Sequence, residues 1–120
     1  MKKLILSFFI LGATTSLSFA QDALQIKSEG EFRETVVGKK WTISWGDGWV
    51  KINPDGTFVG DSPYGKLKGD WYWKGRTWCR KGNAGSRVLT EDCQKFFLIG
   101  KKIMKNVTQN APKGNYYYMN

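Results

Sequence analysis

A strict alternation of residue character over Lys66–Lys74 is the feature that most constrains the fold of this chain. Every second position carries an apolar residue or glycine, namely Leu67, Gly69, Trp71 and Trp73. A period of two places successive side chains on opposite faces of a β-strand. Lys74–Arg76 offers a turn, and the chain then returns through Thr77–Cys79. We therefore predict a hairpin with Trp71 and Trp73 as core aromatics and a polar outer face.

The same period recurs from Lys39 to the end of the chain. Turn residues interrupt it at intervals of about eight to twelve residues, which is typical of antiparallel β-proteins. The clearest turn is Asn53–Gly56, where proline, aspartate and glycine occupy the positions that a tight turn favours. No βαβ spacing is visible. The pattern predicts a mainly β protein of about seven or eight strands, a small antiparallel up-and-down β-barrel or flattened barrel.

One helical signal precedes the strands. Ser28 and Glu31 fit a capping box, Phe32 and Val36 stand one helical turn apart, and Gly38 can close the helix. We predict a short helix that packs one apolar stripe on the sheet. The expected division is an N-terminal segment at 21–38 and a barrel domain at 39–120.

Residues 1–20 have the features of a secretory signal peptide. Lys2 and Lys3 precede an apolar run that ends at Leu11, and Ser18–Ala20 supplies small residues for cleavage after Ala20. The run is too short to span a bilayer, and no later segment is long enough. We expect a periplasmic or secreted protein with no membrane span.

The mature part would carry two cysteines, Cys79 and Cys93, in an oxidising compartment. Such a pair predicts a disulfide, and the 15-residue loop that it closes would contribute about 3 kcal/mol in the chain-entropy model. The glycine- and charge-rich stretch Lys81–Asp92 is expected to be a loop between the two cysteines. Two thiolates without companion ligands do not favour a metal site.

The chain contains no histidine, which removes most neutral-pH catalytic systems. An enzyme would have to use carboxylates with a lysine, and the candidates are Asp70, Glu91 and Asp92. No catalytic residue, metal or cofactor is expected from the sequence.

Two groups of residues are candidates for binding. Trp45 and Trp49 bracket a tight turn and could form an exposed aromatic pair. The second group is a basic face interleaved with tyrosines, made of Tyr64, Lys66, Lys68, Tyr72 and Lys74, with Arg76, Arg80, Lys81 and Arg87 nearby in sequence. Beyond residue 20 there are 17 basic and 10 acidic residues, so acidic proteins or anionic envelope components are the expected partners. Export argues against nucleic acid.

The order of motifs resembles a group of small exported bacterial proteins with one disulfide and a lipocalin-like appearance. The likeness rests on "NPDGTF", "GDWYWKGRTWCR", "EDCQ" and a closing aromatic strand, and it covers most of the mature chain. It implies a lipocalin-like barrel and transfers no catalytic residue. Some of these proteins carry the enzyme name dihydrodipicolinate reductase. That activity is not expected here, because the chain has no G-x-G-x-x-G motif after a strand.

Two binding functions follow from this reading, and we expect a monomer for either. The first is an exported non-enzymatic binding or inhibitor module that acts on a protein or an anionic envelope component. The alternative is a lipocalin-like carrier of a small apolar ligand. A solid core with an exposed patch at Trp45 and Trp49 would favour the first function, and an interior cavity would favour the carrier.

Overall fold

The computed structural model of the protein describes residues 22–119, so the predicted signal peptide and its cleavage site lie outside the described residues. Within that range there are nine strands and one helix. The helix is α1 (Glu29–Thr35). The strands are β1 (Leu24–Gln25), β2 (Lys40–Ile43), β3 (Trp49–Ile52), β4 (Thr57–Ser62), β5 (Gly65–Lys74), β6 (Thr77–Ala84), β7 (Arg87–Ile99), β8 (Ile103–Val107) and β9 (Asn115–Tyr118).

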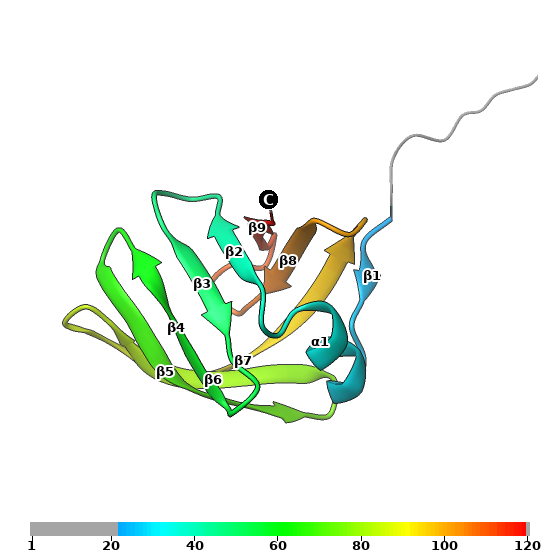
Figure 1. The fold of residues 1–120 in the computed structure, drawn as a ribbon, viewed down its shortest axis with the longest axis horizontal. Coiled ribbons are helices and arrows are strands. Elements are labelled where there is room, and N and C mark those ends of the chain that lie inside the picture. The colour runs from blue at the N-terminus through cyan, green and yellow to red at the C-terminus, as the bar shows by residue number, and fades with distance from the viewer. Residues whose placement is uncertain (1–21, 120) are drawn as a thin grey trace, which may run out of the picture.

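Strands β2 to β9 form a closed antiparallel barrel, which confirms the predicted fold class (Figure 1). Each strand pairs with the next along the chain, and β9 pairs back to β2 through Tyr117 and Ile43. Strand β1 is additional and pairs with β7, where Leu24 is opposite Leu98. None of the helical structure between residues 22 and 119 is long and apolar enough to cross a membrane.

Helix α1 lies at one end of the barrel (Figure 1). Its N-cap is the predicted one, because the Ser28 hydroxyl accepts a hydrogen bond from the Glu31 backbone N–H at 3.2 Å. Phe32 is fully buried, and its ring centroid lies 5.0 Å from that of Trp73 and 5.2 Å from that of Phe96. The helix therefore closes this end of the barrel with an aromatic side chain.

The aromatic core is concentrated near α1. Trp41 and Trp71 are buried, and Trp73 is partly buried against the same cluster. The indole N–H of Trp41 donates to the carbonyl of Val36, and that of Trp71 donates to the carbonyl of Asn53. These bonds satisfy the one polar atom that each indole carries into the core.

The predicted disulfide between Cys79 and Cys93 is confirmed, but the loop predicted between the cysteines is wrong. Strand β6 continues to Ala84 and β7 begins at Arg87, so only two residues separate the strands. Arg80, Gly82 and Ala84 lie on one face of β6, as the period of two in a regular strand requires. The stretch resembled a loop because it has a glycine where two strands approach closely and charged residues on both faces of the barrel wall.

Two glycines allow the close approach of β5 and β6. Gly69 and Gly82 are Cα partners across these strands. A Cβ atom on Gly82 would lie 2.1 Å from the carbonyl oxygen of Lys68 and 2.7 Å from the Cα of Gly69. A side chain does not fit there without a shift of the backbone, so glycine maintains the local curvature of the barrel wall.

Candidate ligand-binding cavity

A cavity of about 510 Å³ occupies the interior of the barrel at the end opposite α1. It reaches the turns that join β2 to β3, β4 to β5 and β8 to β9, where Trp45, Tyr64 and Ala111 lie at its mouth. Its inner end is formed by Trp78, Phe96 and other buried side chains. The volume falls within the range of small-molecule sites in proteins, roughly 300–1,000 Å³.

The cavity has one mainly apolar wall and one wall that is richer in polar residues, although the second also contributes Leu89 and Met104. The apolar wall comes mainly from strands β2 to β6 and includes Ile43, Val50, Phe58, Leu67 and Ala84. The polar wall comes from β7 to β9 and the turn before β9, and includes Asp92, Gln94, Asn106, Thr108, Asn110, Asn115 and Tyr117. A molecule that filled this space would meet hydrocarbon on one side and hydrogen-bonding groups on the other.

Arg80 extends into the cavity from β6, and its side chain is only 18% exposed. Its guanidinium donates a hydrogen bond of 2.6 Å to the backbone carbonyl of Thr90. That carbonyl lies in an irregularity of β7, where the register with β6 shifts between Arg80 and Gly82. Burial lowers the pKa of Arg80 from its ordinary value, and the nearby Asp92 carboxylate opposes that change.

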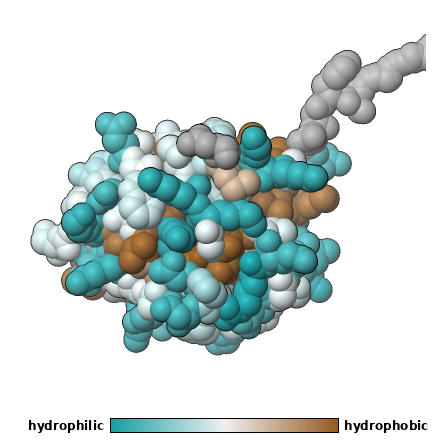
Figure 2. Space-filling view, in the orientation of Figure 1, coloured by the Kyte–Doolittle hydropathy of each residue, from teal (hydrophilic) through white to brown (hydrophobic). Residues whose placement is uncertain are grey.

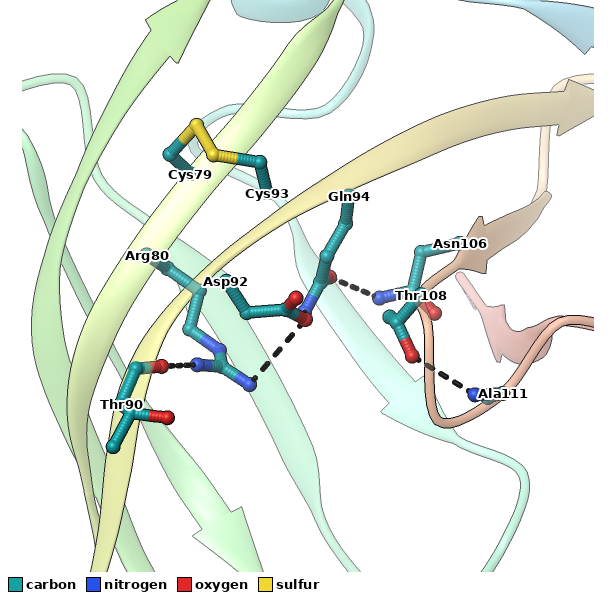
Figure 3. Close-up of polar contacts among 9 residues, drawn as sticks. All are labelled: Cys79, Arg80, Thr90, Asp92, Cys93, Gln94, Asn106, Thr108 and Ala111. Atoms are coloured by element: carbon teal, nitrogen blue, oxygen red, sulfur yellow. Dashed lines mark hydrogen bonds and ion pairs between the residues drawn. A yellow bond between two sulfur atoms is a disulfide. The ribbon is translucent and has the colours of Figure 1, made fainter.

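A chain of polar side chains continues from Arg80 across the interior (Figure 3). A guanidinium nitrogen of Arg80 lies 4.0 Å from a carboxylate oxygen of Asp92. The amide of Gln94 donates to that same oxygen at 3.0 Å, and the amide of Asn106 donates to Gln94 at 2.5 Å. The disulfide lies on the outer face of the same two strands, because Cys79 and Cys93 alternate with these inward residues (Figure 3).

Two buried polar atoms that belong to cavity-lining residues have no hydrogen-bond partner among the described residues. They are the indole nitrogen Nε1 of Trp78 and the side-chain oxygen Oδ1 of Asn106. Trp78 is 5% exposed and Asn106 is 4% exposed. Unsatisfied buried polar atoms are uncommon in folded proteins and destabilise them. Both atoms are buried, so each is an unsatisfied polar group in the wall beside the cavity rather than a group exposed to it.

Tyr117 completes the polar wall from β9. Burial raises the pKa of its phenol above the ordinary value, and polar contacts with Asn106 and Trp45 and the charge of Arg80 oppose that change. The neutral phenol is thus the stable form inside the barrel, and it can both donate and accept a hydrogen bond.

The mouth of the cavity is aromatic and basic. The rings of Trp45 and Tyr64 lie 6.3 Å apart, and the guanidinium of Arg87 lies 3.9 Å from the centroid of Tyr64. Next to them, the hydroxyl of Thr108 accepts a hydrogen bond from the backbone N–H of Ala111 at 3.0 Å (Figure 3). These residues border the cavity at the end of the barrel that lies away from α1.

The structure separates the two tryptophans that were predicted to form an exposed pair. Trp45 lies at the mouth of the cavity. Trp49 faces outward from β3, where the ammonium of Lys40 lies 4.6 Å from its ring centroid. The turn between them reverses the chain, so they do not present one joint surface.

The predicted basic face lies on the outer wall of the barrel. Lys66, Lys68 and Lys74 are exposed on β5, and Tyr72 lies between them. Lys66 is 3.7 Å from the Asp61 carboxylate, in an exposed pair that contributes little to stability. Figure 2 shows one side of the molecule, on which hydrophilic residues cover most of the surface and hydrophobic ones form separate patches. Arg80 does not belong to this outer face, since it points inside.

The three acids considered for catalysis do not share a site. Asp70 is exposed on the outer face of β5, and Glu91 accepts a hydrogen bond from Tyr72 on the outside of the barrel. Asp92 alone of the three lines the cavity. No group of three or more histidine, cysteine, aspartate or glutamate side chains suited to a metal ion occurs in residues 22–119.

Sequence reasoning missed the residues that make the interior polar, namely Arg80, Gln94, Asn106 and Tyr117. The available signal was the period of two in Asp92, Gln94 and Phe96, which places all three on one face. No protein-family model, curated protein or solved structure matches this chain.

Proposed function

We propose that the protein binds a small amphipathic molecule inside its barrel and serves as a carrier for it. One observation supports this most strongly. A cavity of about 510 Å³ inside the barrel has an apolar wall opposite polar side chains that include Arg80, Asp92 and Gln94. Apolar cavities bind hydrocarbon without needing such groups, so the polar atoms indicate a ligand with a hydrogen-bonding part.

The cavity also favours one of the two binding functions considered for this sequence. A partner-binding module was expected to have a solid core and an aromatic pair at Trp45 and Trp49. The core beside α1 is solid, but the other half of the barrel is hollow, and the two tryptophans face different ways. The geometry therefore favours an interior ligand over a partner that docks on this aromatic pair.

An extracytoplasmic setting fits this role. The disulfide between Cys79 and Cys93 is compatible with an oxidising compartment. A barrel that encloses its ligand keeps apolar surface away from water while the ligand is carried. We propose that the protein performs this task in the periplasm or outside the cell.

Titration with Nile red, a neutral fluorescent dye, tests the proposal. Leu89 lines the cavity, whereas Val88 is its neighbour on β7 and is 68% exposed on the outer face. Leu89→Trp should fill part of the cavity and weaken dye binding by at least about tenfold, or ~1.4 kcal/mol. Val88→Trp is the matched control and should leave the dissociation constant within about twofold.

The dye should bind the wild-type protein saturably and with a stoichiometry of one. Absence of saturable binding would contradict the proposal. Equal binding by the wild type and by folded Leu89→Trp would also contradict it, because the dye would then occupy the outer surface. Circular dichroism of both variants establishes that they retain the β-rich fold.

A further inference from the structure

The charged residues that line the cavity indicate the chemical class of the ligand. Three charged residues line the cavity, namely Arg80, Arg87 and Asp92. Two are cationic and one is anionic, so the interior and its mouth have an excess positive charge. A cleft with one prevailing sign of charge attracts ligands of the opposite sign.

Arg80 is only partly neutralised by the protein. Its guanidinium has five N–H donors, and the described residues provide it with the bond to Thr90 and the 4.0 Å approach to Asp92. A separation of 4.0 Å is at the outer limit of an ion pair. The Asp92 oxygen concerned also accepts a hydrogen bond from Gln94, which further divides its charge.

We propose that the barrel selects small organic carboxylates, and that Arg80 binds the carboxylate group. Two parallel N–H···O bonds between guanidinium and carboxylate are among the strongest hydrogen-bonded pairs in proteins. The apolar part of the molecule then lies along the wall formed by residues such as Val50 and Leu67. This inference rests on the proposed interior binding and adds the charge and identity of the head group.

The second cation has a role at the entrance. Arg87 lies against Tyr64 at the mouth, where its guanidinium is exposed. An approaching carboxylate meets this charge before it reaches Arg80. Arg87 therefore contributes to the rate of entry, whereas Arg80 determines the affinity.

Calorimetric titration with decanoate and with decanol tests the inference, because the two molecules share a hydrocarbon chain and differ in the charged group. Wild-type protein should bind decanoate at least about tenfold more tightly than decanol. Arg80→Met should remove this preference by weakening decanoate binding and should leave decanol binding within about twofold. Lys81→Met is the matched control, since Lys81 is the next residue on β6 and is exposed on the outer face.

Asp92→Asn is a second variant, and we expect it to strengthen decanoate binding where Arg80→Met weakens it. It removes the anion that competes for Arg80 and retains an oxygen that can accept the hydrogen bond from Gln94. Decanoate binding should become tighter by roughly three- to tenfold, and decanol binding should be unchanged. A general loosening of the barrel would affect both molecules alike.

The outcomes separate this inference from the proposed function. Equal affinities for decanoate and decanol in the wild type would overturn carboxylate selection, whatever the variants do, while interior binding would stand. A preference that persists in folded Arg80→Met would overturn the role of Arg80. If neither molecule binds and Nile red does not bind, both the inference and the proposed function fail.

Discussion

Arg80 and Asp92 are Cα partners on β6 and β7, yet the guanidinium hydrogen-bonds to the Thr90 carbonyl and stays 4.0 Å from the carboxylate. The register shift that follows Arg80 accounts for this arrangement, because it brings a backbone carbonyl of β7 within reach of the side chain. The cation is thereby held in the interior with the Asp92 carboxylate at the outer limit of an ion pair. A site that must accept an anion needs such a cation.

The disulfide should stabilise the β6–β7 hairpin that carries Arg80. Cys79→Ser or Cys93→Ser should each lower the free energy of unfolding by roughly 2–5 kcal/mol, because loss of the cross-link increases the freedom of the unfolded chain. The double variant should lose no more than the larger single loss. Urea denaturation measures these changes, and thiol titration of the unfolded, unreduced protein should find no free cysteine in the wild type.

Phe32 should be the most sensitive position in α1. Phe32→Ala removes the ring that packs against Trp73 and Phe96, and a cavity in the core should cost about 3–5 kcal/mol. Leu24→Ala is a suitable control, since Leu24 is 70% exposed on β1 and should change stability by about 0.5 kcal/mol or less. Similar small losses for both variants would show that α1 does not close the barrel.

Two glycine substitutions should have opposite effects on stability. Gly82→Ala should lower the free energy of unfolding by about 1–3 kcal/mol, because its Cβ would overlap the Lys68 carbonyl. Gly30 lies in α1 with nothing within 4 Å of a Cβ, so Gly30→Ala should raise stability by about 0.5–1 kcal/mol. Thermal unfolding of both variants checks the signs, and a stable Gly82→Ala would contradict the close approach of β5 and β6.

The phenol of Tyr117 should lose its proton at a higher pH than the phenol of an exposed tyrosine. Burial raises the pKa of its phenol in the folded protein, so the folded state holds the proton more tightly than the unfolded state does. The resulting stability is complete below the unfolded value of about 10 and is lost as the pH rises through the folded pKa. In an alkaline titration followed by phenolate absorbance, Tyr117→Phe should show one late-ionising group fewer than the wild type.

A second late group provides the control for that titration. The pKa of Tyr72 is also raised, because its hydroxyl donates a hydrogen bond to Glu91 on the outer wall. Tyr72→Phe should remove its own late step and leave that of Tyr117. If Tyr117→Phe has the same titration curve as the wild type, the phenol is not buried in the cavity.

The barrel was predictable because its strands alternate with a period of two and its turns carry glycine, proline and aspartate, as at Asn53–Gly56. The capping box at Ser28 and the pairing of Cys79 with Cys93 were local signals of the same kind. The interior site was not predictable, because it depends on which strands meet after closure. Asp92 lay in the predicted loop and Arg80 was grouped with the basic face, and only the pairing of β6 with β7 places them inside.

Intermolecular nuclear Overhauser effects from bound decanol to the methyl groups of the protein show directly whether the ligand lies inside the barrel. Interior binding predicts contacts to Leu89 and Val50, which line the cavity. Val88 and Val59 are exposed on the outer wall and should show none. Contacts confined to Val88 and Val59, or no contact with any methyl group, would contradict the account of this protein as a barrel that binds its ligand inside.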